Sequence, residues 1–127
     1  MTKNTKVNAA ILIIGNEILS GRTQDTNTST LAIWLNSIGV KVNEVRVIPD
    51  IEKTIVDTLN ILRKENNYVF TTGGIGPTHD DITAQSVSKA FGRKYEIHKE
   101  AFKILEAYYQ PGEFNEGRRR MVWMPEN

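Results

Sequence analysis

The chain has 127 residues, a net charge of +1 and no cysteine, and 39% of its residues are hydrophobic. That length fits one domain with a core of its own, and the missing cysteines exclude disulfides, thiolate metal sites and a cysteine nucleophile. With only two histidines, a multi-histidine zinc site within one chain is excluded as well. The near-neutral charge gives no support for nucleic acid or a membrane surface as a partner, and the apolar run 9–14 is too short for a signal sequence or a membrane span. We therefore expect a cytoplasmic protein.

The first half of the chain alternates predicted strands and helices. The continuous apolar run 9–14 predicts a buried, parallel strand, and residues 15–22 are expected to form a loop. A helix follows, in which Trp34 belongs to the apolar stripe and which Gly39 ends. Residues 40–48 form the second strand, and Asp50 is expected to cap the next helix. The residues that offer cap oxygens to the first helix are Asp25, Thr26 and Asn27.

The second half continues the alternation. We expect a strand at 68–70, a helix at 82–91, a short strand at 95–97, a helix at 101–109 and a short helix at 115–121. This order predicts an α/β fold with a parallel sheet covered on both faces. Ligands of such sheets bind at the carboxyl ends of the strands. The loops 15–25 and 71–81 both begin at such an end. We assign one domain, 9–127, after a flexible N-terminal stretch, 1–8.

A glycine-rich loop directly follows the third strand. Gly73, Gly74 and Gly76 allow the backbone to approach a ligand closely, and the start of the next helix favours an anion. Thr71, Thr72 and Thr78 add hydroxyl groups. The segment is neither a P-loop nor a dinucleotide loop, because neither spacing is present. A phosphate cradle is the functional interpretation, and a tight turn that needs glycine only for its geometry is the alternative.

Four carboxylates are candidates near this loop. Asp80 and Asp81 would repel a phosphate unless a cation lay between them, so a hydrated Mg²⁺ shared with phosphate oxygens is one interpretation. The alternative is capping, because Thr78 and Asp81 have the spacing of a capping box. Asp50 is expected at the same sheet edge, either as a helix cap or as a ligand group. Glu17, after the first strand, is a third acid for the site or a solvated side chain.

Other polar and aromatic residues carry weaker signals. The run Arg118-Arg119-Arg120 is more typical of a solvated helix face than of a site, and His79 is typical of a turn on the surface. Trp123, Tyr108 and Tyr109 fit packing under the C-terminal segment or a subunit interface equally well.

Taken together, these segments resemble one family in order and spacing. They are Gly15-Asn16-Glu17-Ile18-Leu19-Ser20-Gly21, Thr26-Asn27, Val47-Ile48-Pro49-Asp50 and Thr71-Thr72-Gly73-Gly74-Ile75-Gly76-Pro77-Thr78-His79-Asp80-Asp81-Ile82-Thr83. The chain resembles the nucleotide- and molybdopterin-binding domain of CinA-like (competence/damage-inducible) proteins, which is related to the molybdopterin adenylyltransferases. The resemblance covers nearly the whole chain from Ala9.

The resemblance implies a three-layer α/β/α sandwich with a mostly parallel sheet. It also implies a nucleotide or a molybdopterin as ligand, a homo-oligomer that is a dimer or a trimer, and hydrolysis of a nucleotide pyrophosphate such as ADP-ribose with Mg²⁺, Mn²⁺ or Co²⁺. By motif, Asp81 and Asp50 match the acids that function in the adenylyltransferases. With the metal inferred above from the paired carboxylates, Asp81, Asp80 and Asp50 would be catalytic, with Asp80 and Asp81 on the metal. The ligand-binding positions would be Thr72, Gly73, Gly74, Gly76, Thr78, Gly15, Glu17 and Asn27.

The sequence departs from this pattern in two places. Asp80 stands where the adenylyltransferases usually carry a basic residue, which counts against adenylyl transfer to molybdopterin. The chain also ends at Asn127, before a loop and a strand that the family usually adds, so we expect a domain truncated at its C-terminus. Three hypotheses follow: a metal-dependent pyrophosphatase, an adenylyltransferase-like protein, and a binding module without catalysis.

Overall fold

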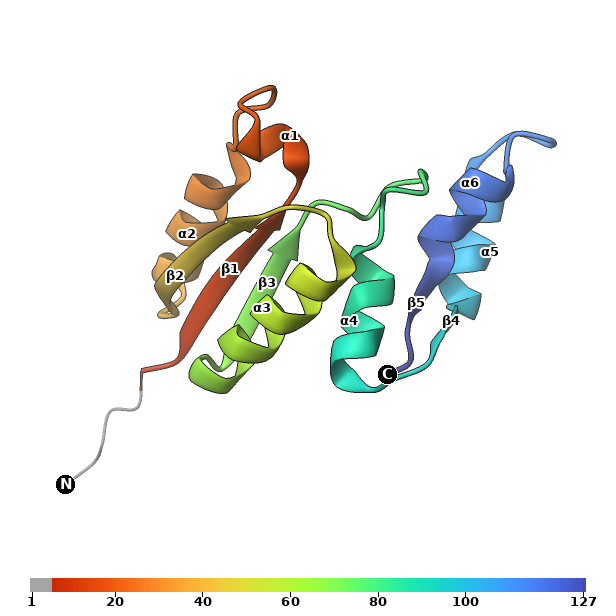
Figure 1. The fold of residues 1–127 in the computed structure, drawn as a ribbon. Coiled ribbons are helices and arrows are strands. Elements are labelled where there is room, and N and C mark those ends of the chain that lie inside the picture. Colours follow the sequence, from red (N-terminus) through yellow and green to blue (C-terminus); the bar gives the residue numbers. More distant parts are fainter. Residues whose placement is uncertain (1–5) are drawn as a thin grey trace.

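A three-stranded parallel sheet lies at the centre of the fold. The computed structural model describes residues 6–127, and its sheet has the order β2-β1-β3. The central strand β1 (Asn8–Ile14) pairs in parallel with β2 (Lys41–Ile48) on one side and with β3 (Tyr68–Thr72) on the other (Figure 1). The continuous apolar sequence of β1 suits this central position, because both faces of a central parallel strand are covered.

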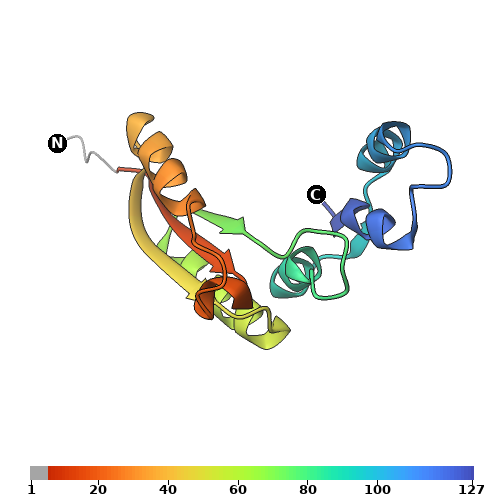
Figure 2. The ribbon, with the colours of Figure 1, turned by 90° about the horizontal axis from the view of Figure 1, so that it is seen from above.

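Helices cover both faces of this sheet. Alternate residues of β1, namely Ala10, Leu12 and Ile14, share one core cluster with residues of α3 (Glu52–Glu65), and α4 (Thr83–Phe91) packs beside α3. On the opposite face lies α2 (Asn27–Ser37), whose Leu35 is buried (Figure 2). The expected α/β architecture with a parallel sheet between helices is confirmed.

A smaller group of elements follows α4. It consists of β4 (Tyr95–Ile97), α5 (Lys99–Tyr108), α6 (Glu116–Arg119), the 3-10 helix η1 (Arg120–Val122) and β5 (Trp123–Pro125). The sequence did not indicate β5, which pairs antiparallel with β4 and places the end of the chain against α4. Figure 1 shows this group on the far side of α4 from the sheet. Three residues including a proline are too few to give a strand signal.

Aromatic rings form the core of this smaller group. Phe114 is buried, and its ring lies 5.3 Å from the ring of Phe102 and 6.1 Å from that of Tyr109. Tyr109 therefore packs within the C-terminal group. This agrees with the first of the two interpretations of its sequence position, packing under the C-terminal segment. Tyr108 is 77% exposed, so it contributes little to this core.

Two expectations about the N-terminal part need correction. A short helix, α1 (Asn16–Leu19), lies in the segment expected to be a loop. Residues 1–5 of the stretch expected to be flexible lie outside the described residues, but Asn8 already belongs to β1. Its side chain and backbone exchange two hydrogen bonds with Asn67, of 3.0 and 2.8 Å.

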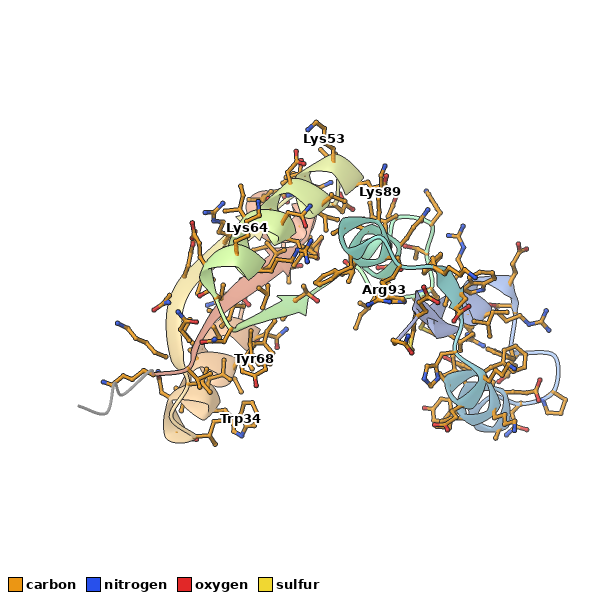
Figure 3. The ribbon with its side chains drawn as sticks, turned by 90° about the horizontal axis from the view of Figure 1, so that it is seen from below. Trp34, Lys53, Lys64, Tyr68, Lys89 and Arg93 are labelled. Atoms are coloured by element: carbon orange, nitrogen blue, oxygen red, sulfur yellow. The ribbon has the colours of Figure 1, made fainter. Side chains whose placement is uncertain are left out.

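The prediction that Trp34 belongs to the core is wrong. Its side chain is 54% exposed, whereas the next residue, Leu35, is buried. Successive residues of a helix point about 100° apart, so α2 can direct Leu35 to the sheet only by turning Trp34 outward. Figure 3 shows Trp34 on α2 at the surface. Ile33 and Ile38 of the same helix are also exposed.

No helix in the described part of the chain combines the length and the apolar character that crossing a membrane requires.

Candidate functional site

The glycine loop between β3 and α4 is held in place by close backbone packing. Gly73 has φ +88°, and a Cβ there would collide with the carbonyl oxygen of Ile14 at the end of β1. Gly74 has φ +67°, and a Cβ there would collide with the hydroxyl of Thr83. Only glycine fits such positions without strain. The tight-turn interpretation is therefore sufficient to explain why Gly73 and Gly74 are glycines.

Thr83 is the residue that fixes this loop, and the sequence interpretation missed it. Its side chain is buried, its hydroxyl donates a hydrogen bond of 2.8 Å to the carbonyl oxygen of Gly73, and its N–H donates one of 3.1 Å to that of Gly74. A threonine at the first position of the helix that follows a glycine loop was the available signal. These two bonds join the start of α4 to the start of the loop.

Asp81 folds back onto the loop. Its Oδ2 accepts hydrogen bonds of 2.9 Å from both the N–H and the hydroxyl of Thr78. Partial burial alone would raise the pKa of Asp81, but the bonds from Thr78, with a further one from the N–H of Gly76, outweigh burial and hold the pKa below its ordinary value. A Cβ on Gly76 would lie 2.8 Å from Oδ2, so this glycine makes room for the carboxylate.

The capping interpretation of Thr78 and Asp81 is only half right. The expected hydrogen bond between the two residues exists, but α4 begins at Thr83, with Ile82 at the cap position and no side-chain cap bond. The pair therefore closes a turn inside the loop and does not cap the helix. The carboxylate belongs to the loop itself.

Asp80 and His79 lie at the exposed tip of the loop. His79 Nε2 is 3.3 Å from Asp80 Oδ1, and both side chains are more than two-thirds exposed. Within residues 6–127, no cluster of three or more histidine, cysteine or acidic side chains is arranged to hold a metal ion. The described residues therefore do not form a complete metal cage around Asp80 and Asp81.

A hollow of about 230 Å³ lies on the β1 side of the loop, and we name it the Glu17 hollow. Glu17, Asp25, Asn27, Thr72 and Gly73 are among the residues that line it. Asp25 already accepts hydrogen bonds from the backbone of Asn27 and Thr28 at the start of α2. Neither lysine nor arginine occurs among its described lining residues, so its polar character is acidic.

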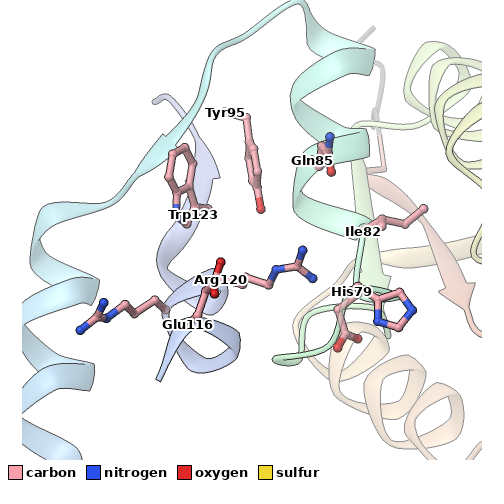
Figure 4. Close-up of a pocket in the computed structure, with 9 residues that line it drawn as sticks. His79, Ile82, Gln85, Tyr95, Glu116, Arg120 and Trp123 are labelled. Carbon is pink, nitrogen blue, oxygen red and sulfur yellow. The ribbon is translucent and has the colours of Figure 1, made fainter. Parts of the chain in front are cut away.

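A second hollow of about 230 Å³ lies on the other side of the loop, and we name it the Arg120 hollow. Gly74, Ile75, Gly76 and Asp81 line one side of it, whereas η1 and β5 line the other side with residues that include Arg120 and Trp123. It adjoins a cavity of about 410 Å³ that also borders Asp81, Tyr95, Arg120 and Trp123 (Figure 4). The sequence interpretation had assigned Arg118–Arg120 to a solvated face and had left Trp123 undecided.

The remaining predicted site residues lie apart from both hollows. Asp50 follows β2, which β1 separates from β3 and the glycine loop, and it lines neither hollow. The prediction that Asp50 caps α3 is wrong, because α3 begins at Glu52 with Ile51 at the cap position and no side-chain cap bond. Gly15 is buried, and its N–H donates to the carbonyl oxygen of Ile48. Gly15 thus joins β1 to β2 instead of facing a hollow.

These features define an α/β domain with a glycine loop at the carboxyl end of its parallel sheet. The family model described as "Probable molybdopterin binding domain" matches residues 10–125. This chain therefore belongs to the molybdopterin-binding domain family, which confirms the resemblance inferred from its motifs.

Sequence relatives carry names of the CinA-like group. A CinA-like protein of Citrifermentans bemidjiense is 38% identical over 118 residues, which cover 91% of this chain and 28% of that protein. A relative from Alkaliphilus oremlandii, whose name describes a competence-damage inducible protein, is 38% identical over 93% of this chain and 29% of its own length. The chain thus spans less than a third of the length of these two curated relatives.

Solved structures share the fold. The protein CinA of Thermoplasma acidophilum superposes with a TM-score of 0.88 at 30% identity, over 97% of this chain and 72% of that one. The molybdopterin biosynthesis enzyme MoaB of Thermus thermophilus superposes with a TM-score of 0.66 at 17% identity, over 95% of this chain and 75% of that one. At that identity the second likeness concerns the fold alone.

Proposed function

We propose that this domain binds a phosphate-bearing nucleotide or pterin at its glycine loop. The observation that carries this proposal is that Gly74, Ile75 and Gly76 border an open hollow. A loop that served only as a turn would need no such opening. Backbone N–H groups of a glycine loop that leads into a helix favour an anion, and the family description names a molybdopterin as the type of ligand.

Charge favours one of the two hollows for the phosphate. The Arg120 hollow contains the carboxylate of Asp81 but also a guanidinium group, which offsets that negative charge and binds phosphate with two parallel hydrogen bonds. The Glu17 hollow contains carboxylates, which repel phosphate but accept hydrogen bonds from hydroxyl groups. A ligand that places its phosphate in the Arg120 hollow and its sugar hydroxyls in the Glu17 hollow would therefore match the charges of both hollows.

A divalent metal fits this site only when the phosphate-bearing ligand is also bound, because the ligand's phosphate oxygens would complete the coordination of the metal. Asp80 and Asp81 supply two neighbouring carboxylates, and Mg²⁺ is commonly held by one or two carboxylates with phosphate oxygens and water. Asp81 is already hydrogen-bonded to Thr78, so Asp80 is the more available of the two. When bound there, such an ion would neutralise and polarise a phosphoryl group.

The reaction we assign to this site is hydrolysis of a nucleotide pyrophosphate such as ADP-ribose. The oxygen of a water molecule bonds to one phosphorus, the bridging P–O bond breaks, and AMP and ribose 5-phosphate leave. The protons of the water pass to the departing phosphate and to solvent. Asp80, at the exposed tip of the loop, is the carboxylate available to orient this water.

Release of AMP from ADP-ribose tests the catalytic part of the proposal. We expect release with Mg²⁺, Mn²⁺ or Co²⁺, and a loss of at least tenfold in kcat for Asp80→Asn with ADP-ribose binding retained. Asp57→Asn is the matched control, because Asp57 lies on α3 and within residues 6–127 pairs only with Lys53, one helical turn away. Equal rates for Asp80→Asn and Asp57→Asn would contradict a catalytic role for Asp80.

A binding module without turnover is the second candidate. The hydrogen bonds that Asp81 accepts from Thr78 and Gly76 favour the binding module, because they occupy a carboxylate that a metal would otherwise use. Binding of ADP-ribose, measured by calorimetry, without AMP release with any of the three metals would select this candidate. Absence of binding by nucleotides and by phosphorylated pterins would overturn both.

A further inference from the structure

We propose that Arg120, together with the paired rings of Tyr95 and Trp123, forms a clamp that selects a phosphate joined to a planar heteroaromatic ring. This inference rests on the proposed function and specifies which parts of the ligand the Arg120 hollow recognises. No residue of the clamp was among the site residues expected from the sequence.

The strand pair β4–β5 creates the aromatic half of the clamp. In its antiparallel register Tyr95 lies opposite Pro125 and Ile97 lies opposite Trp123, so Tyr95 and Trp123 are diagonal neighbours. Their ring centroids are 5.4 Å apart with an angle of 41° between the planes. Both rings border the Arg120 hollow and the adjoining cavity. Trp123 remains 37% exposed, which leaves part of a large ring available for contact.

The three consecutive arginines differ in what they contact. Arg118 lies over the ring of Tyr109 at 4.3 Å and donates to the carbonyl oxygen of Glu113, and Arg119 lies 5.5 Å from the ring centre of Phe114. Both thus contact the aromatic core of the C-terminal group. Arg120 has no ion pair and no side-chain hydrogen bond within residues 6–127. Arg119 also borders the adjoining cavity, but of the three arginines only Arg120 borders the hollow beside the glycine loop as well.

Figure 4 shows where this guanidinium lies. The side chain of Arg120 extends from η1 toward α4, and the hydroxyl end of Tyr95 points into the same space. Burial raises the pKa of the Tyr95 phenol, and the positive charge of Arg120 opposes that effect, which agrees with their proximity. The cation, the aromatic pair and the carboxylate of Asp81 thus border the same hollow.

The chemistry of the clamp matches a phosphate attached to an aromatic ring. A guanidinium binds phosphate through two parallel N–H bonds, while a tryptophan or tyrosine ring stacks on any heteroaromatic base because every base has a π face. Gly74, Ile75 and Gly76 of the glycine loop form the opposite wall of the same hollow. The adjoining cavity, of about 410 Å³, falls within the usual range of small-molecule sites, about 300–1,000 Å³.

Tryptophan fluorescence tests the aromatic half, because the chain has only two tryptophans. In a Trp34→Phe background, Trp123 is the sole reporter. We expect ADP-ribose, or neopterin triphosphate if the ring is a pterin, to change its emission in a saturable manner, whereas inorganic pyrophosphate changes it much less. Equal changes with pyrophosphate and with the ring-bearing compounds would overturn the stacking part of the clamp.

Calorimetry with Arg120→Ala tests the cationic half. We expect at least a tenfold loss of affinity for ADP-ribose, no detectable pyrophosphate binding and unchanged binding of adenosine. The control is Arg93→Ala, because Arg93 is exposed near the end of α4 and lines neither cavity (Figure 3). Trp123→Leu, with its fold checked by circular dichroism, should weaken ADP-ribose and adenosine alike.

The outcomes separate this inference from the proposed function. If the unchanged chain binds ADP-ribose and both Arg120→Ala and Trp123→Leu bind it equally well, the clamp is wrong and the glycine-loop proposal stands. If the unchanged chain binds neither nucleotides nor phosphorylated pterins, both the clamp and the glycine-loop proposal are wrong.

Discussion

The hydroxyl of Thr83 donates a hydrogen bond of 2.8 Å to the carbonyl oxygen of Gly73, across ten residues of sequence. This bond closes the glycine loop on itself, because Gly73 begins the loop and Thr83 begins the helix that follows it. The shape of the candidate site therefore depends on a side chain outside the glycine motif.

Thr83→Val tests this dependence. The valine keeps the shape of the side chain but removes the hydroxyl, and losing a buried hydrogen bond costs about 1–3 kcal/mol. We expect chemical denaturation to show that loss, and calorimetry to show weaker ligand binding because the loop is released. Thr83→Ser keeps the hydroxyl and should retain binding. If Thr83→Val binds like the unchanged chain, the bond has no part in shaping the site.

Gly73→Ala should destabilise the domain strongly. The added Cβ would collide with the carbonyl oxygen of Ile14, and the residue has φ +88°. Together these effects should cost about 3 kcal/mol or more. Gly92→Ala is the matched control, because Gly92 also has positive φ (+62°) but has open space where a Cβ would lie. It should cost only about 1–2 kcal/mol, and equal losses in urea denaturation would contradict the packing argument.

Asp81 should contribute to stability in a pH-dependent manner. Its pKa is lower in the folded chain than its ordinary value, so its contribution is present above the unfolded pKa and is lost as pH falls through the folded pKa. At neutral pH we expect Asp81→Asn to lose about 1 kcal/mol, allowing for partial exposure of the side chain. The difference between the unfolding free energies of the two proteins should begin to shrink below about pH 4 and disappear below the folded pKa of Asp81. A difference that stays constant down to pH 2.5 would contradict this account.

Arg120 should influence the titration of Tyr95 without any ligand. Because the guanidinium favours the ionised phenol, Arg120→Ala should raise the pKa of Tyr95 further above its ordinary value. Alkaline titration by NMR with ¹³C-labelled tyrosine separates Tyr95 from the other three tyrosines. Arg93→Ala should leave the titration of Tyr95 unchanged. No shift in Arg120→Ala would mean that the two side chains do not lie together in solution.

The exposed apolar face of α2 leads us to expect self-association. Ile33, Trp34 and Ile38 are between 54% and 70% exposed, and contiguous exposed apolar side chains commonly mark an interface. We expect a dimer or a trimer by sedimentation velocity, and a shift toward monomer in Trp34→Arg. The control is Ile61→Arg, because Ile61 is also exposed but lies on α3. If both variants sediment like the unchanged chain, α2 is not the interface.

Local patterns in the sequence were sufficient for the order of the main strands and helices. The apolar run of β1 and the glycines that end α2 and α4 can be recognised from a short stretch of sequence. The hydrophobic period and positive φ are local properties, so distant residues are not needed to predict them. The glycine loop was also located from sequence, since its composition and its position after a strand are both visible there. The family resemblance rested on the same segments, and the match over residues 10–125 agrees with it.

Only the tertiary structure decided which side chains meet at the site. Trp34 and Leu35 are adjacent apolar residues, and the packing of α2 on the sheet determined which of them is buried. Asp81 was expected to act on a helix or a metal, but it accepts bonds from Thr78 because the turn brings the two together before the helix begins. Arg120 lies opposite the glycine loop because β5 pairs with β4. The contacts of Leu35 and Arg120 join segments distant in sequence, so no local pattern records them. The bond between Thr78 and Asp81 is local, and only its position before the helix was decided by the fold.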